Sequence, residues 1–413
     1  MTRRVVITGL GVISPVGKNP AEFFSNLMAG RSGIKRLQTD FIEQRSIRIG
    51  APVEGFDPNA HFSKMQLSGI ERFSQFALVA AEQAVQDAQL ELAEAEHPRA
   101  GVCMGSCLGG AGTLEDGYVE TLLRKPPRVK PLSVLLSMNN AAASHLSIKY
   151  HLQGANMTYA TACSSSAIAV GEAYRQIKHG YADVMLAGGS EAMLTLGAMK
   201  AWEALRTLAH EDPNDAGASC KPFSKDRTGL VLGEGAAVLV LEDAERAMKR
   251  GAKIYAELAG YDCSSDSSHI TKPDAAGQTR TIRNALREAQ MQPQDIHYIN
   301  AHGTATLAGD IEETKAIKQV FGAHATRVPV SSTKSMHGHL MGATGAVEFM
   351  AALLALHNQA IPPTISLHEP DPECDLDYVP NVGRSNVKLD AVMSNSFAFG
   401  GSNAVLIAKR FNG

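Results

Sequence analysis

Cys163 combines a reactive side chain with a setting that could expose it to a substrate. It lies in TYATACSSSAIAVGEA, where small residues come directly before a stretch with helical spacing. If a helix begins just after the cysteine, its backbone amides and the positive end of its dipole would stabilise a thiolate, the nucleophilic form of the side chain. Cys163 is therefore a candidate nucleophile, and a buried structural cysteine is the alternative interpretation.

Two histidines occupy loops of the kind that hold catalytic groups. His302 lies in NAHGTATLAGD after an apolar segment, and His339 lies in SSTKSMHGHLMGATGA before a long apolar stretch. A single loop histidine is more often solvated or hydrogen-bonded, but two in glycine-rich turns favour a site shared with the cysteine. His337 lies outside the Gly-His pair and is assigned no role. No metal site is predicted, because His337 and His339 have no carboxylate or thiolate nearby in the sequence.

A glycine turn near the end of the chain could contribute a backbone amide. In SNSFAFGGSNA, residues 394–404, Phe399 comes directly before Gly400 and Gly401, so its ring could swing and its amide could bind an oxyanion. The turn is not a dinucleotide-binding GxGxxG opening a helix. The other glycine-rich segment, GLVLGEGAA, lacks the lysine and serine of a phosphate-binding loop and predicts a bend into a strand.

The elements that must position these residues alternate along the chain. Apolar segments predict strands near residues 4–8, 101–106, 182–192, 253–263, 296–304 and 391–410, and a strand followed by a helix at 235–251. Helical spacing predicts helices near residues 72–89, 164–178, 279–290 and 344–359. This alternation is typical of α/β layers. A chain of 413 residues exceeds a single ordinary core. We therefore expect two halves, 1–251 with the nucleophile and 252–413 with both histidines.

The composition narrows the class of protein. The net charge of −3 gives no indication of a nucleic-acid partner. No apolar run reaches the roughly 20 residues of a membrane span, and the glycines and proline in MTRRVVITGLGVISPVG favour a strand over a signal peptide. The six cysteines have spacings that fit neither a disulfide framework nor a zinc knuckle. A soluble cytoplasmic protein with free thiols is expected.

Four motifs, in their order along the chain, resemble those of the β-ketoacyl carrier-protein synthase I/II family, the elongating ketosynthases. They are TACSSSA around Cys163, NAHGTAT around His302, TKSMHGHLMGATGA around Lys334 and His339, and NSFAFGGSNA around Phe399. The segment KPFSKDRTGLVLGEGA and the opening VVITGLGVISPVG match the same family, so the resemblance covers essentially the whole chain. It implies a thiolase fold, with two similar αβαβα halves in five layers, and a dimer.

The resemblance also implies an activity. Cys163 would accept an acyl group and condense it with malonyl-acyl carrier protein in a decarboxylative Claisen reaction of fatty acid synthesis. Neutral His302 and His339 would stabilise the enolate left by loss of carbon dioxide, and the amides of Cys163 and Phe399 would hold the oxyanion. Lys334 would orient the site and pair with Glu313.

Further positions match family residues that contact the substrates. Phe399 resembles a gate between the empty and the acylated enzyme, in the same turn as Gly400 and Gly401. Thr304 and Thr306 resemble residues that bind the pantetheine arm. Leu108 matches the position that limits the acyl pocket, although it is equally an ordinary core residue.

The implied partners are an acyl carrier protein and a second synthase chain. Carrier proteins are acidic, so basic residues are expected at the tunnel mouth, with Lys64, Arg128, Arg206 and Lys272 as candidates. Some family members hold a monovalent cation near positions matching Glu348, Ser394 and Asn395. No organic cofactor is implied.

The sequence departs from the fatty-acid members at several positions, which leaves alternatives open. Leu307 replaces a proline that is usual there, and Ser68 and Gly69 occupy positions that are often basic. The run after the nucleophile is similar to ketosynthases of type II polyketide and aryl-polyene pathways. In that alternative, pairing with a chain-length-factor-like subunit is left open beside a homodimer. A third hypothesis, a non-catalytic thiolase-fold partner, conflicts with the intact Cys163 and both histidines. The sequence indicates neither acyl length nor the carrier protein used.

Overall fold

A ten-stranded sheet organises the chain, described by a computed structural model over residues 2–39 and 46–413. Its strand order is β10-β9-β13-β14-β8-β1-β7-β6-β4-β5. The N-terminal half supplies β1 (Val5–Ile13), β4 (Ala100–Gly105), β5 (Asn156–Tyr159), β6 (Val184–Glu191) and β7 (Gly235–Asp243). The C-terminal half supplies β8 (Ala256–Ser265), β9 (Tyr298–Asn300), β10 (Val330–Ser331), β13 (Ala391–Phe397) and β14 (Ser402–Lys409).

The two halves of the sheet have the same topology. When the five strands of each half are numbered in chain order, both halves read 3-2-4-5-1 from their outer edge to the centre. The halves meet where β1 pairs antiparallel with β8, with Val5 opposite Leu258. The repeat confirms the predicted α/β fold of two similar halves.

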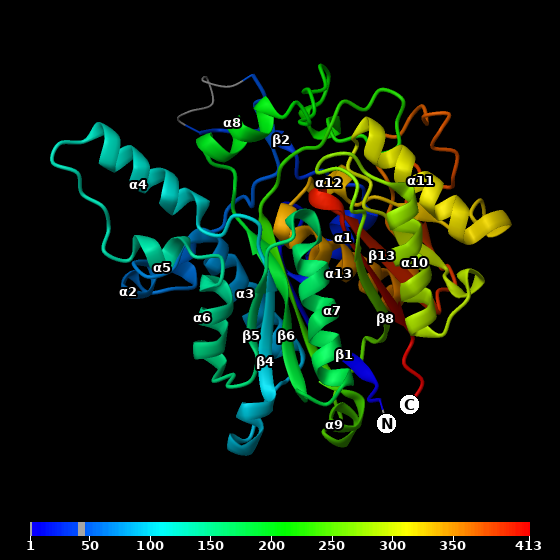
Figure 1. Cartoon of the computed structure of the whole chain (residues 1–413), viewed down its shortest axis with the longest axis horizontal. Coiled ribbons are helices and arrows are strands. Elements are labelled where there is room, and N and C mark those ends of the chain that lie inside the picture. Colours follow the sequence, from blue (N-terminus) through cyan, green and yellow to red (C-terminus); the bar gives the residue numbers. More distant parts are fainter. Residues whose placement is uncertain (1, 40–45) are drawn as a thin grey trace.

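Helices cover and separate the halves in five layers (Figure 1). α3 (Arg72–Asp87) and α6 (Ala141–Tyr150) pack on the outer face of the N-terminal strands. α10 (Ala275–Ala289) and α11 (Leu307–Phe321) cover the outer face of the C-terminal strands. Between the two halves lie α7 (Ser165–Lys178) and α13 (Thr344–Asn358), and each contacts strands of both.

Glycines allow the central helices to approach their neighbours closely. A Cβ at Gly171 of α7 would lie 2.1 Å from the ring of Tyr261 on β8. A Cβ at Gly345 of α13 would lie 2.7 Å from Ala167 of α7. Side chains at these positions would overlap atoms of the neighbouring element. The N-terminal ends of α7 and α13 therefore meet, and these ends follow Cys163 and His339.

The remaining elements lie around this core. The other helices are α1 (Pro20–Met28), α2 (Lys64–Leu67), α4 (Ala111–Leu123), α5 (Ser133–Ser137), α8 (Leu196–Ala204), α9 (Ala244–Lys249) and α12 (Lys334–His337). Two short strand pairs join β2 (Lys35–Arg36) to β3 (Ile49–Gly50) and β11 (Ala360–Ile361) to β12 (Arg384–Ser385). Among the described residues, no helix has both the length and the apolar character to cross a bilayer.

The structure refines the expected elements around the candidate site. The predicted strand at 296–304 is only Tyr298–Asn300, and the chain then turns into the loop that carries His302. The predicted helix at 164–178 begins at Ser165, after a 3₁₀ turn that contains Cys163. The proposed boundary between 251 and 252 falls between α9 and β8 and stays a prediction.

Candidate active site

Cys163 lies at the start of the central helix α7, where donors surround its sulfur. It is 4% exposed, in the turn Ala162–Ser164, and Ala162 has a left-handed φ of 52°. Burial raises the pKa of the thiol to about 11, while the Lys334 charge and the backbone amides of Phe399 and Cys163 act to lower it. Burial therefore outweighs the Lys334 charge and these two amides, which favours the thiol form at neutral pH.

His339 contacts the sulfur directly. Its Nε2 is 3.0 Å from Cys163 Sγ, and its Nδ1 accepts a hydrogen bond of 3.1 Å from the backbone amide of Met341. Because Nδ1 is an acceptor, the ring proton belongs on Nε2, facing the sulfur. Burial and the nearby Lys334 charge hold the pKa of His339 well below 6.5. The ring is therefore neutral and donates through Nε2.

His302 faces His339 across the site in the same tautomer. The two ring centroids are 5.6 Å apart and nearly perpendicular. Lys334 Nζ lies 3.3 Å from His302 Nδ1, and an ammonium can only donate, so the proton of this ring is also on Nε2. Burial, the Lys334 charge and His339 hold the pKa of His302 well below 6.5. The site thus offers two neutral N–H donors beside one thiol.

The same three residues are close enough to raise the question of a metal. A ligand atom from each of Cys163, His302 and His339 lies within 4.8 Å of the other two. A histidine that binds a metal through Nε2 normally donates its Nδ1–H to an acceptor. Here both Nδ1 atoms instead accept, from Met341 and Lys334. The neighbours therefore orient the rings for hydrogen-bond donation and fit a metal ion poorly.

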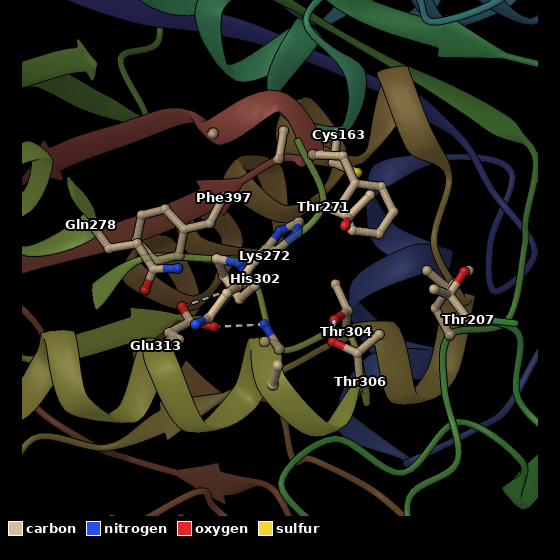
Figure 2. A pocket seen from close by; sticks show the side chains of 18 of the residues that line it. Cys163, Thr207, Thr271, Lys272, Gln278, His302, Thr304, Thr306, Glu313 and Phe397 are labelled. Carbon is tan, nitrogen blue, oxygen red and sulfur yellow. Dashed lines mark hydrogen bonds between the residues drawn. The ribbon is translucent and has the colours of Figure 1, made fainter. Parts of the chain in front are cut away.

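Lys334 pairs with a different carboxylate from the one predicted. Its Nζ donates to Glu348 Oε1 and to the carbonyl oxygen of His302, both at 2.5 Å, and both charged side chains are fully buried. The predicted pairing with Glu313 is wrong, because N–H groups already occupy the oxygens of Glu313. They are the amides of His302 at 2.9 Å and Gly303 at 2.7 Å (Figure 2), and Asn395 Nδ2 at 3.0 Å.

Four buried oxygens on α13, β13 and β9 are candidates to hold an ion or water. Among the described residues they have no hydrogen-bond partner, and they are Glu348 Oε2, Ser394 Oγ, Asn395 Oδ1 and Asn300 Oδ1. A carboxylate, amide and hydroxyl oxygens suit a hard cation or an ordered water. Three of the four residues match the positions where the family resemblance implies a monovalent cation, and their chemistry fits one.

A cavity of about 180 Å³ leads from Cys163 to the surface, past the loop before α10 and the start of α11. Its lining includes Cys163, both histidines, Thr304, Thr306, Phe399, Gly401 and Lys272. Figure 2 shows Cys163, Lys272, His302, Thr304 and Thr306 around it. Ile270 also lines it and is 73% exposed, so the cavity opens to solvent. The hydroxyls of Thr304 and Thr306 are 2.9 Å apart in a hydrogen bond. The cavity is mostly apolar, with this hydroxyl pair along one wall.

The remaining predicted residues lie outside the cavity lining. Gly400 lies in the turn between β13 and β14 with a φ of 81°, a conformation that favours glycine. Leu108 is half-exposed, and its amide donates to the buried Glu191. Arg206 follows α8 with a left-handed φ of 57°. Lys64 begins α2, and Arg128 lies between α4 and α5, on the side of the molecule away from α10 (Figure 1). The structure leaves the roles of these residues as predictions.

Sequence reasoning missed several residues that shape the site. Trp202, the single tryptophan, stacks on Phe399 with centroids 5.9 Å apart. Gln278 lines the cavity, and its buried Oε1 has no partner among the described residues. Arg227 holds the loop that carries Thr304 and Thr306. Arg227 lies in the motif KPFSKDRTGLVLGEGA, so the sequence did contain a signal for this residue.

Comparison with known proteins gives a consistent family. The model of the Beta-ketoacyl synthase, N-terminal domain matches residues 2–247, and that of the Beta-ketoacyl synthase, C-terminal domain matches residues 255–368. A 3-oxoacyl-[acyl-carrier-protein] synthase 2 from Coxiella burnetii is 44% identical over 410 residues, covering 99% of both chains. A protein of the same name from Synechocystis sp. is 41% identical over 411 residues, covering 99% of this chain and 98% of its own.

Solved structures agree. "The ishigamide ketosynthase/chain length factor" superposes with a TM-score of 0.93 at 34% identity, with both chains fully covered. A type II PKS ketosynthase bound to its acyl-carrier protein and a hexaketide gives a TM-score of 0.91 at 34% identity, again over both full chains. These likenesses confirm the predicted thiolase-type fold. The chain belongs to the β-ketoacyl synthase family.

Proposed function

We propose that this chain is a β-ketoacyl-[acyl carrier protein] synthase that extends acyl chains in fatty acid synthesis. It condenses an acyl thioester with malonyl-acyl carrier protein and releases β-ketoacyl-acyl carrier protein and carbon dioxide. The observation that carries the proposal is Cys163 Sγ, 3.0 Å from His339 Nε2 at the end of a cavity that opens to solvent. The name shared by the relatives, 3-oxoacyl-[acyl-carrier-protein] synthase 2, supports it.

Acyl transfer to Cys163 is the first step. The sulfur attacks the thioester carbonyl, a C–S bond forms, and the oxyanion accepts hydrogen bonds from the amides of Cys163 and Phe399. The old C–S bond then breaks, and the carrier's thiol leaves with the proton that the cysteine lost. Because the resting thiol has a raised pKa, this proton moves during the attack rather than before it.

Condensation is the second step. The malonyl thioester oxygen accepts hydrogen bonds from Nε2–H of His302 and of His339, and these stabilise the enolate formed when the carboxylate leaves as carbon dioxide. The enolate carbon attacks the acyl-cysteine carbonyl, and Cys163 leaves as a thiolate that takes up a proton. Lys334 acts through His302, because its bond to Nδ1 keeps the other ring nitrogen protonated. Phe399, stacked on Trp202, would move between the two steps.

Two variants test these roles separately. Cys163→Gln removes the nucleophile but leaves both histidines, so it should release carbon dioxide from malonyl-acyl carrier protein and form no β-ketoacyl product. His302→Ala removes one enolate donor and should lower carbon dioxide release by about 10²–10³-fold. A Cys163→Gln protein that still condenses, or one that no longer decarboxylates, would overturn the assignment.

Partner binding is proposed from exposed apolar side chains. They cluster on α4, α5 and the loop between them, at Leu114, Tyr118, Val119, Leu122, Leu123, Val129, Leu132, Val134, Leu135 and Met138. β5 is an edge strand of the sheet and, among the described residues, pairs only with β4. So large an apolar surface is typical of an interface. A second copy, or a related synthase-like chain, is the proposed occupant.

The proposed carrier-protein contacts are the basic residues around the cavity mouth. Lys272 lines the mouth directly, and Arg206 lies beside the cavity residue Thr207. Lys64 in α2 and Arg128 between α4 and α5 lie away from the cavity mouth. In a dimer they would contribute to carrier-protein binding at the cavity of the partner chain. All six cysteines are free thiols, which supports a reducing compartment, and the cytoplasm is the proposed location.

A specialised pathway is the second candidate function. Of the two structural neighbours described above, one is named as a type II PKS ketosynthase with its acyl-carrier protein, and the other is named as a ketosynthase with a chain length factor. In that case the chain would extend a polyketide or aryl polyene and work as a heterodimer. Affinity purification from the native host separates the two. A partner chain of synthase type without the nucleophile supports the specialised pathway, and recovery of this chain alone supports the first proposal.

A further inference from the structure

The loop that carries Thr304 and Thr306 has a strained shape that something must hold. Both hydroxyls line the cavity and bond to each other. Between them, Ala305 has a φ of 63°, a left-handed conformation that costs free energy for any residue with a Cβ. Leu307, the next residue after the pair, is exposed and begins α11. The loop therefore needs contacts from behind to keep both hydroxyls on the cavity wall.

Arg227 supplies those contacts from a fully buried side chain. Its Nε donates to the carbonyl of Thr306 at 3.2 Å, and its Nη2 donates to the carbonyl of Leu307 at 2.8 Å. Its Nη1 donates to the carbonyl of Ser224 and to Asp371 Oδ2, both at 2.7 Å. All three guanidinium nitrogens are thus used, two of them on the threonine loop.

Asp310 contacts the same loop from its other side. We call the buried side chains of Arg227 and Asp310, together with Asp371, the clamp. Asp310 Oδ1 accepts from the amide of Ala305 at 3.1 Å, and its Oδ2 accepts from the amide of Phe223 at 2.7 Å. Asp310 Oδ2 is also 3.4 Å from Arg227 Nε, with both side chains fully buried. The strained residue is therefore held through its amide while Arg227 holds the carbonyls that follow.

We propose that Arg227 is a positioning residue for the pantetheine arm of the substrate. The inference rests on the proposed function, in which Thr304 and Thr306 hydrogen-bond the amides of that arm. Arg227 does not touch the substrate; it holds the loop so that both hydroxyls face the cavity. The substrate class recognised in this way is a thioester whose amides lie in the thiol part of the molecule and not in the acyl group.

The geometry requires arginine at this position. A guanidinium presents its donors in a rigid planar fork that reaches several acceptors in fixed directions, whereas lysine has a single charged nitrogen. Arg227→Lys keeps the buried charge facing Asp310 and Asp371 but cannot hold the two loop carbonyls and the Ser224 carbonyl together. The conservative variant therefore separates loop positioning from loss of charge.

The test compares two acyl donors that share an acyl group. One is hexanoyl-pantetheine, and the other is hexanoyl ethyl thioester, which has no amide. The acylation rate of Cys163 is measured by mass spectrometry over a range of donor concentrations. In Arg227→Lys the second-order rate constant for the pantetheine donor should fall about tenfold, as expected for two misplaced hydrogen bonds, and that for the ethyl thioester should stay unchanged.

Two further variants keep the result interpretable. Arg246→Lys changes a partly buried arginine of α9, paired with Glu96 and Glu242 on the opposite side of the molecule from α11 (Figure 1), and should alter neither rate constant. Asp371→Asn weakens the clamp at its more exposed end and should lower the pantetheine rate constant by a smaller factor; it carries the test if Arg227→Lys does not fold. The proposal is overturned if folded clamp variants keep the full advantage of pantetheine, or if both donors slow equally. If neither donor acylates the unaltered protein, the proposed function itself fails.

Discussion

Replacing Lys334 with methionine would leave a carboxylate in the core without its cation. Lys334 Nζ is 2.5 Å from Glu348 Oε1, and neither side chain is exposed. Burial acts to raise the pKa of Glu348 above its ordinary 4.5, and the adjacent Lys334 charge acts to lower it. In Lys334→Met that opposition disappears, so Glu348 will be protonated in the folded protein at pH 7.

The cost of this change follows from the proton that Glu348 must bind. Protonating a carboxyl group of ordinary pKa 4.5 at pH 7 costs about 3.4 kcal/mol, at about 1.4 kcal/mol per pH unit. This agrees with the roughly 3–5 kcal/mol seen when one partner of a buried ion pair is removed. The folded variant binds a proton that the unfolded chain does not bind, so its stability deficit should grow as pH rises above 4.5 and shrink as pH falls.

A double variant separates the stability of the pair from its role in the site. Lys334→Met with Glu348→Met removes both charges and keeps apolar volume, so the free energy of unfolding should recover most of the loss. Decarboxylation should not recover, because His302 Nδ1 and the His302 carbonyl still lack their donor. We expect carbon dioxide release to remain about 10²–10³-fold below the unaltered protein.

Urea unfolding at pH 5 and pH 7 measures the first part, and release of carbon dioxide from malonyl-acyl carrier protein measures the second. A Lys334→Met deficit that is the same at both pH values would show that Glu348 does not bind the proton. A double variant that decarboxylates at the normal rate would show that Lys334 does not act through His302.

Three further outcomes follow from the site and the surface. Because the pKa values of His302 and His339 lie well below 6.5, the rate of decarboxylation should not fall near pH 6.5, and a rate that titrates there would contradict this. The free energy of unfolding should decline below pH 6.5, because the same histidines bind protons in the unfolded chain. Since Trp202 stacks on Phe399, tryptophan fluorescence should change when the nucleophile is acylated and should not change in Phe399→Ala; no change in the unaltered protein argues against a moving gate. Leu123→Glu, on an exposed apolar face, should shift sedimentation from dimer to monomer, and an unchanged dimer would exclude this face.

Much of the fold was predictable because its signals are local. Helical spacing gave α3, α10 and α13 to within a few residues, and the apolar runs gave β1, β6 and β8. Helix α11 was missed, since its charged sequence DIEETKAIK mixes exposed and buried positions without a clear apolar stripe. The short strands β5 and β10 depend on neighbours far along the chain, and local patterns do not show that pairing.

The candidate site was also predictable only in part. The motifs picked out Cys163 and both histidines, and the structure brings them within contact of one another. Spacing along the chain could not identify the carboxylate that pairs with Lys334, because it does not distinguish Glu313 from Glu348. Only the packing of α13 against the site places Glu348 beside the lysine, while Glu313 satisfies amides of the histidine loop.

The most direct measurement is the mass of the protein after incubation with an acyl-acyl carrier protein, followed by peptide mapping. We expect one acyl group, located on the peptide that contains Cys163, with the other five cysteines unmodified. The adduct should be absent from Cys163→Ala. A protein that gains no acyl group, or an adduct that persists in Cys163→Ala, would contradict the claim that this thiol is the nucleophile.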